Sequence, residues 1–222
     1  MTTMRIKTLA KFWGDEWRYR RIARKFGPWT MVPQAIYVCN LRLAAQVKNV
    51  AGAIVECGTW RGGMIAGVAD VLGKDRRYYL FDSYEGLPPA REIDGAGALA
   101  WQADKSGPSY HNNCAASEEE AREAMSQSLA VDYRIIKGWF NDTLSKMDSS
   151  EKIALLRMDA DWYDSTKCIL DHFGGRVVPG GMIVVDDYYT WEGCTVAVNE
   201  YAAAHKWRIQ QSRYAGVCFI RI

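Results

Sequence analysis

The stretch that decides the fold is residues 53–63, A-I-V-E-C-G-T-W-R-G-G. Its first five residues form a short apolar run typical of a buried strand, and three glycines follow within the next six residues. Residues 62–72 then have the pattern of a helix, so the glycines mark a strand-to-helix turn. The spacing is not the G-x-G-x-x-G of dinucleotide-binding folds, and no G-K-[ST] of a nucleoside triphosphate site is present. We expect a turn whose backbone approaches a ligand closely.

Short apolar runs alternate with amphipathic stretches along the rest of the chain. After the first strand, strands are predicted at residues 77–81, 133–137, 153–158, 182–185, 207–210 and 217–222. Helix signals lie in the gaps, among them a capping box formed by Ser117 and Glu120 and a last long helix at 194–205. This alternation predicts an α/β, Rossmann-like fold: a seven-stranded, mostly parallel sheet whose last strand pair is antiparallel, with helices on both faces.

Length and composition indicate a single domain over residues 1–222, with 49% apolar and 24% charged residues. The net charge of +2 is too small to indicate nucleic-acid binding. Six cysteines without a C-x-x-C pair argue against a zinc cluster or a disulfide framework. No apolar run approaches 18 residues and the first residues do not resemble a signal peptide, so we expect a cytoplasmic protein without a membrane span.

Two segments stand apart from this pattern. Residues 1–25 hold eight Lys or Arg against Asp15 and Glu16, interleaved with aromatic residues. They could bind an anion, a membrane or a nucleic acid, but we favour a helix whose aromatics pack on the domain or on a second subunit. Residues 1–50 are therefore expected to form a helical segment that contributes lid or oligomer contacts. Residues 83–116, rich in Gly, Pro and Ala, are predicted to form a mobile loop near the functional site.

Acidic residues follow two of the predicted strands. Asp159 and Asp161 lie in R-M-D-A-D-W-Y-D-S-T, and Asp186 and Asp187 in M-I-V-V-D-D-Y. Ligands of parallel sheets bind beyond the carboxyl ends of the strands, and residues two apart in an extended chain share a face. Asp186 and Asp187 can both reach one ion only if the strand has already ended. Ordinary capping would explain any one aspartate, but four together favour a hard cation such as Mg²⁺. The three histidines are too far apart to indicate zinc.

A second set of residues indicates a ligand with a ribose and a flat base. Asp82 follows the second strand in Y-Y-L-F-D-S-Y, 24 residues after Gly58, and its carboxylate could accept hydrogen bonds from vicinal hydroxyls. Ser83 could donate to the same ligand. The aromatic pair at 139–140, after Gly138, could stack on an adenine. A turn cap at Asp82 and a core position for the aromatic pair are the alternatives.

The motif E-C-G-T-W-R-G-G resembles motif I of the class I S-adenosylmethionine-dependent methyltransferases. Over residues 50–220 the chain resembles the macrocin and mycinamicin type of sugar O-methyltransferase, in motifs that occur in one order. They are V-E-C-G-T-W-R-G-G, L-F-D-S-Y-E-G-L-P-P, K-G-W-F-N-D-T-L, R-M-D-A-D-W-Y-D-S-T and G-G-M-I-V-V-D-D-Y-Y-T-W-E-G-C. The resemblance implies S-adenosylmethionine- and Mg²⁺-dependent methylation of a sugar hydroxyl on a glycosylated natural product, by a homo-oligomer. Ala160 and Trp162 depart from the glycine and the smaller side chain that the family tends to have there.

These patterns and the resemblance give one set of expected roles. Asp159, Asp186 and Asp187 are expected to hold the metal, and Asp161 to act as the base that deprotonates the acceptor hydroxyl. Arg61 could aid the cofactor or only brace the turn. The residues expected to bind the cofactor are Glu56, Gly58, Thr59, Arg61, Gly62, Gly63, Asp82, Ser83, Gly138, Trp139, Phe140 and Asp159.

Three other functions stay open. A catechol-type O-methyltransferase would use a similar metal on an aryl diol, and the aromatic residues Trp101, Tyr110, Trp162, Tyr188, Tyr189 and Trp191 suit a sugar or an aryl acceptor. A metal-dependent phosphate-ester hydrolase would use the aspartates but not the glycine turn or Asp82. A binding protein that has lost catalysis would not need four aspartates. The expected partner is a small-molecule glycoside, with no nucleic acid and no membrane.

Overall fold

The computed structural model describes residues 2–212 and 217–222, with side chains from residue 14 onward. The strands form one seven-stranded sheet in the order β3-β2-β1-β4-β5-β7-β6. The first five strands are parallel to one another, and β7 pairs antiparallel with both β5 and β6. Their bounds are β1 (Ala53–Cys57), β2 (Arg77–Asp82), β3 (Asp132–Lys137), β4 (Ile153–Met158), β5 (Val177–Val185), β6 (Ile209–Gln211) and β7 (Cys218–Arg221). The predicted architecture is confirmed.

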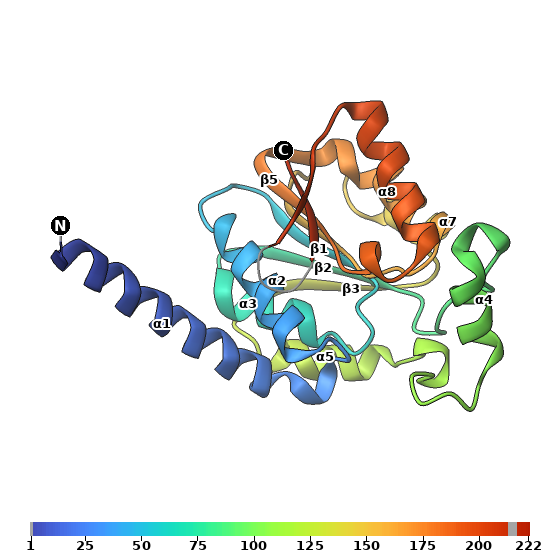
Figure 1. Ribbon diagram of the computed structural model, residues 1–222, viewed down its shortest axis with the longest axis horizontal. Helices are drawn as coiled ribbons and strands as arrows, with labels where there is room; N and C mark the ends of the chain where they lie inside the picture. The colour runs from blue at the N-terminus through green and yellow to red at the C-terminus, as the bar shows by residue number, and fades with distance from the viewer. Residues whose placement is uncertain (1, 213–216) are drawn as a thin grey trace.

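Helices cover both faces of the sheet (Figure 1). One face packs against α1 (Thr2–Lys25), α2 (Gln34–Gln46), α3 (Gly63–Leu72) and α5 (Glu118–Ser126). The other packs against α6 (Phe140–Thr143), α7 (Tyr163–Phe173) and α8 (Glu192–His205). Alternate residues of β1 supply the two cores: Ile54 faces the first, and Ala53, Val55 and Cys57 face the second. All five residues of β1 are buried, as expected of a central strand covered on both faces.

The helix α5 begins with the capping box that the sequence predicts. Ser117 Oγ accepts a hydrogen bond from Glu120 N at 3.1 Å, and Ser117 N donates to Glu120 Oε2 at 2.9 Å. These bonds satisfy two backbone donors at the start of the helix. The carboxylates of Glu118, Glu119 and Glu120 also lie where the helix dipole favours negative charge.

Residues 83–116 are not one long loop, which corrects that prediction. They contain the helix α4 (Gly95–Ala103) between the short turns η2 (Glu92–Asp94) and η3 (Asn112–Cys114). The sequence G-A-G-A at the start of α4 has weak helix propensity, so tertiary contacts must supply what local preference does not. Asp94 supplies one, because its Oδ1 accepts from Tyr163 N at 2.7 Å. In Figure 1 α4 (green) lies at one edge of the molecule, near α7 and α8. The mobility of this segment stays a prediction.

Residues 1–50 are largely helical, as expected. In Figure 1 α1 (dark blue) extends away from the sheet, and among its described side chains Tyr19, Ile22 and Ala23 join the core. Tyr19 packs on the domain, as expected, whereas Trp17 is 64% exposed. Packing of Trp17 on a second subunit stays a prediction, and Phe12 and Trp13 lie outside the described side chains. Within residues 2–212 and 217–222, no helix is long and apolar enough to cross a membrane. Lid and oligomer contacts stay predictions.

Candidate functional site

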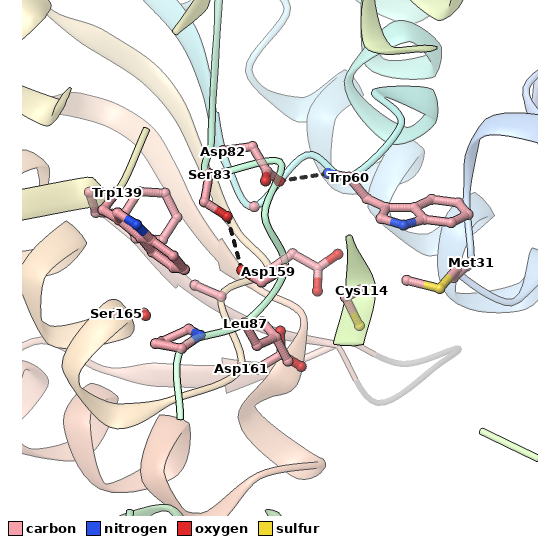
Figure 2. A pocket seen from close by; sticks show the side chains of 15 residues that line it. Met31, Trp60, Asp82, Ser83, Leu87, Cys114, Trp139, Asp159, Asp161 and Ser165 are labelled. Carbon is pink, nitrogen blue, oxygen red and sulfur yellow. Dashed lines mark hydrogen bonds between the residues drawn. The ribbon is translucent and has the colours of Figure 1, made fainter. Parts of the chain in front are cut away.

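A pocket lies beyond the carboxyl ends of β1, β2 and β4 (Figure 2), where the sequence places its ligand. Trp139 stands on one side of the pocket, and Trp60 and Met31 stand on the other. Six of the residues expected to bind a cofactor line it: Gly58, Asp82, Ser83, Trp139, Phe140 and Asp159. Its other lining residues are Met31, Trp60, Gly86, Leu87, Pro88, Cys114, Ala160, Asp161 and Ser165. The predicted cofactor residues and the predicted base, Asp161, therefore share one cavity.

The glycines of the turn serve different purposes. Gly58 has φ +81°, and a Cβ there would overlap the carbonyl oxygen of Asp159, so only glycine lets β1 and β4 close at this point. Gly62 has φ +76° and backs onto Ala121 of α5. A Cβ at Gly63 would overlap the carbonyl oxygen of Trp29. Of these three glycines, Gly58 lines the pocket. Gly62 and Gly63 are needed for the packing of α3 against its neighbours.

The carboxylate of Asp82 holds the turn in place. Its Oδ2 accepts hydrogen bonds from Thr59 N at 2.7 Å and Trp60 N at 2.8 Å, and its Oδ1 accepts from Tyr84 N at 2.7 Å. Trp60 and Tyr84 have φ of 48° and 58°, and these bonds stabilise such strained backbone. Burial raises the pKa of Asp82, whereas the three backbone donors lower it. One lone pair of Oδ1 is left to accept from a ligand hydroxyl.

Four of the expected cofactor residues in addition to Gly62 and Gly63 lie outside the pocket lining: Glu56, Thr59, Arg61 and Gly138. Arg61 lies 3.0 Å from Glu120 Oε1 and stacks over the ring of Trp60 at 4.3 Å, so the structure supports the bracing interpretation. Thr59 Oγ1 lies 3.3 Å from Tyr84 Oη, inside the turn. Glu56 lies beneath the pocket in a buried ion pair with Arg157 at 2.8 Å.

Asp186 points into the interior, toward Arg157. Nη2 of Arg157 lies 3.0 Å from Asp159 Oδ2 and 3.1 Å from Asp186 Oδ2. Asn40 Nδ2 of α2 donates to Asp186 Oδ1 at 3.0 Å, while Asn40 Oδ1 accepts from Arg157 Nε at 3.2 Å. Both oxygens of Asp186 are thus used by neighbouring side chains. The network joins α2, β4 and the end of β5 beneath the pocket.

Asp187 points the other way, toward Asp161, because β5 has ended at Val185 and the chain has turned. Asp187 Oδ2 accepts from Asp161 N at 3.0 Å, and Trp191 Nε1 donates to Asp161 Oδ1 at 2.9 Å. Burial, and then the neighbouring carboxylates, raise the pKa of Asp161 to about 7 and that of Asp187 well above its usual range. Burial likewise raises the pKa of Asp159 to about 6, although Arg157 opposes the shift.

These acids suit a hard cation in their chemistry. Glu56, Asp159 and Asp186 contact the guanidinium of Arg157, whereas Asp161 and Asp187 lie close enough to the other aspartates to raise one another's pKa. A divalent ion would offset the excess negative charge of this cluster. However, no group of three His, Cys, Asp or Glu within the described part of the chain is arranged to hold a metal. The expected set of Asp159, Asp186 and Asp187 is not assembled around one point, since Asp186 faces Arg157 and Asn40.

Sequence reasoning missed several pocket residues. Trp60 lies within the quoted glycine motif and could have been found there. Met31 precedes β1 by more than twenty residues, and Cys114 comes from the predicted loop, so only the folded chain brings them to the pocket. Burial and the nearby aspartates raise the pKa of the Cys114 thiol, which makes it a poor nucleophile.

A sheet in this order, with its pocket at the glycine turn, has the class I methyltransferase fold. The chain superposes on the O-methyltransferase NovP with a TM-score of 0.71 and 30% identity, covering 87% of this chain and 81% of that one. It belongs to the macrocin-O-methyltransferase (TylF) family, whose model matches residues 30–218.

Two curated relatives are O-methyltransferases by name. The chain is 36% identical over 164 residues to the demethyldecarbamoylnovobiocin O-methyltransferase of Streptomyces niveus, covering 70% of this chain and 60% of that protein. It is 29% identical over 161 residues to the mycinamicin III 3''-O-methyltransferase of Micromonospora griseorubida, covering 71% and 63%. The chain thus spans about three fifths of the length of these relatives.

Proposed function

We propose that the protein transfers a methyl group from S-adenosylmethionine to a sugar hydroxyl of a glycosylated natural product. The observation that carries this proposal is that Asp161 lines the same pocket as Gly58, Asp82 and Trp139. A proton acceptor and a site of the cofactor type therefore face one cavity. The family match and the names of the relatives support a sugar hydroxyl as the acceptor.

The pocket has the groups that this cofactor needs. Trp139 is 38% exposed and offers a flat face to an adenine, and the backbone at Gly58 allows close approach. The free lone pair of Asp82 Oδ1 can accept from a ribose hydroxyl. The carboxylates of Asp159 and Asp161 favour the positively charged sulfonium at their end of the pocket.

The chemistry requires that an aliphatic hydroxyl lose its proton. Asp161 accepts this proton, and its raised pKa suits a base near neutral pH. The acceptor oxygen forms a bond to the methyl carbon as the carbon–sulfur bond breaks, and S-adenosylhomocysteine leaves. Asp159, Asp187 and, after release from Arg157, Asp186 would hold Mg²⁺, which makes a hydroxyl more acidic. The rest of the catalysis is positioning within the pocket.

Calorimetry and a methylation assay test the proposal. The protein should bind S-adenosylhomocysteine and should transfer labelled methyl to at least one glycoside in a panel of glycosides and catechols. Asp161→Asn should lower turnover by about 10²–10⁴-fold, the contribution of a positioned base, and leave S-adenosylhomocysteine binding unchanged. Asp171→Asn is the matched control, because Asp171 is exposed, lies outside the pocket and pairs with Lys167 on the same helix. Absence of S-adenosylhomocysteine binding, or full turnover by Asp161→Asn, would refute the proposal.

A catechol acceptor is the second candidate, favoured by the aromatic cluster beside Asp161. The rings of Trp101, Trp162 and Trp191 lie 5.1–6.2 Å apart, and such a surface suits an aryl acceptor as well as a sugar face. The same panel of glycosides and catechols separates the two acceptors.

Homo-oligomeric assembly and a cytoplasmic location complete the proposal. Size-exclusion chromatography with light scattering tests the oligomeric state.

A further inference from the structure

We propose that Trp191 is a positioning residue that sets the orientation of the Asp161 carboxylate. The inference rests on the proposed role of Asp161 as the base. Trp191 is the N-cap residue of α8, thirty residues from Asp161 in the chain, and neither composition nor motif spacing assigns it this role.

The geometry fixes one oxygen of Asp161 and leaves the other for chemistry. Trp191 Nε1 donates to Oδ1 at 2.9 Å, within the range of a strong charge-assisted bond. The backbone of Asp161 is held at φ +57°, and its N–H donates to Asp187 Oδ2 at 3.0 Å. The side chain leaves this fixed backbone toward the pocket that it lines (Figure 2). With Oδ1 engaged, Oδ2 is the oxygen in position to accept a proton.

Trp191 is itself held firmly. Its backbone N–H donates to Asp187 O at 3.0 Å, and its carbonyl accepts from Thr195 N at 3.1 Å as α8 begins. Its ring packs edge to face against Trp162 at 5.1 Å and against Trp101 at 5.9 Å. Trp101 lies on α4, so the segment at 83–116 also supports the indole. A donor held in this way is preorganised and does not have to be ordered during the reaction.

The expected consequence is a loss of rate rather than of binding. Without the indole N–H, the carboxylate can rotate and present either oxygen in several orientations. A misplaced catalytic group lowers the rate of the chemical step, because fewer encounters have the geometry for proton transfer. The residues that form the cofactor pocket do not include Trp191, so affinity for S-adenosylhomocysteine should be unaffected.

The decisive variant is Trp191→Phe, which keeps an aromatic ring and removes the donor. We expect kcat to fall by about tenfold or more, the scale of one charge-assisted hydrogen bond. The KM values of both substrates and the Kd of S-adenosylhomocysteine should change by less than about threefold. Trp207→Phe is the matched control: Trp207 follows the other end of α8 and packs against Tyr201 and His205, and its replacement should leave kcat unchanged.

A double-mutant cycle shows whether Trp191 acts through Asp161. In the Asp161→Asn background, Trp191→Phe should change the residual rate by less than about twofold. If Trp191→Phe fails to fold, replacing Trp191 by benzothienylalanine, which substitutes sulfur for the N–H, gives the same test without loss of volume. An unchanged kcat, an effect on KM alone, or an equal loss in both backgrounds would overturn the inference. Full turnover by Asp161→Asn would instead overturn the proposed function, so the two failures are distinguishable.

Discussion

Arg157 and Glu56 form an ion pair of 2.8 Å whose side chains are only 3% and 1% exposed. Arg157 also contacts Asp159 and Asp186, so its positive charge partly offsets the charge of three carboxylates at the centre of the sheet. Burial raises the pKa of Glu56 to about 8, and the charge of Arg157 acts against that shift. The arrangement concentrates polar groups directly beneath the pocket, where every loss of a partner leaves another group buried and unpaired.

Replacing Arg157 should therefore be costly for stability. Arg157→Met would leave carboxylates buried without their counter-ion, and we expect a loss of about 3–5 kcal/mol in the free energy of unfolding. Urea denaturation followed by circular dichroism measures it. Arg91→Met is the control, because the pair of Arg91 with Asp164 is exposed and should contribute less than about 1 kcal/mol. Similar losses for the two variants would contradict this account of Arg157.

Asp186 and Asp187 should differ in their effect on the metal requirement. Asp187 lies beside Asp161, whereas both oxygens of Asp186 are bonded to Arg157 and Asn40. We expect Asp187→Asn to raise the Mg²⁺ concentration for half-maximal turnover by at least about tenfold. Asp186→Asn should raise it less.

Titrating Mg²⁺ into chelator-treated protein measures both values, and calorimetry without substrate measures binding directly. If the two variants shift the Mg²⁺ requirement equally, Asp186 contributes as much to metal binding as Asp187 does, and the contacts of Asp186 with Arg157 and Asn40 do not weaken its contribution. If wild-type turnover persists in excess chelator, the metal has no part in the reaction.

Gly58→Ala should prevent the turn from closing. The methyl group would overlap the Asp159 carbonyl oxygen, and the positive φ adds strain. We expect little soluble folded protein and no S-adenosylhomocysteine binding, as judged by expression yield and calorimetry. Gly97→Ala is the control: nothing lies within 4 Å of a Cβ there, and alanine suits α4 better than glycine does. Normal folding of Gly58→Ala would show that β1 and β4 tolerate separation.

Asp82→Asn should weaken both the fold and cofactor binding. An amide group can no longer accept from Thr59, Trp60 and Tyr84 together, so at least one backbone donor is left unpaired, at a cost of about 1–3 kcal/mol. Thermal unfolding with and without S-adenosylhomocysteine separates the two effects. Asp75→Asn, at an exposed position before the same strand, should change neither. A loss of stability without a loss of affinity would restrict Asp82 to holding the turn.

Much of this architecture follows from patterns that are local in the sequence. Each strand is a short apolar run, and the ends of parallel strands must meet at one edge, so the sequence predicts that Gly58, Asp82, Asp159 and Asp161 lie together, and all four line the pocket. Their roles stay predictions. The helix α4 was missed because its glycines and alanines have no strong local preference. Contacts with distant parts of the chain hold this segment, such as the hydrogen bond from Tyr163 N to Asp94 Oδ1 at 2.7 Å.

The orientations of side chains in the acid cluster could not be predicted in the same way. Whether Asp186 and Asp187 point to one side depends on the residue at which β5 ends, and this boundary would have to be predicted to within a single residue. Arg157 lies two residues before Asp159, but its role as the counter-ion of the acid cluster can be recognised only in the folded chain, where Asn40 of α2 accepts a hydrogen bond from it. Such information is stored in contacts between segments more than a hundred residues apart.

The position of α2 determines where this protein could be cut or grafted. Tyr37 donates to the carbonyl oxygen of Gly63 at 2.7 Å, and Asn40 completes the hydrogen bonding of Asp186. A recombinant version trimmed to begin at β1 would keep every motif quoted above. It would still lose the contacts of Tyr37 and Asn40 and leave Asp186 without one of its hydrogen-bond donors. Anyone transplanting this sheet into a chimaera should carry residues 34–46 with it, as though they were part of the sheet.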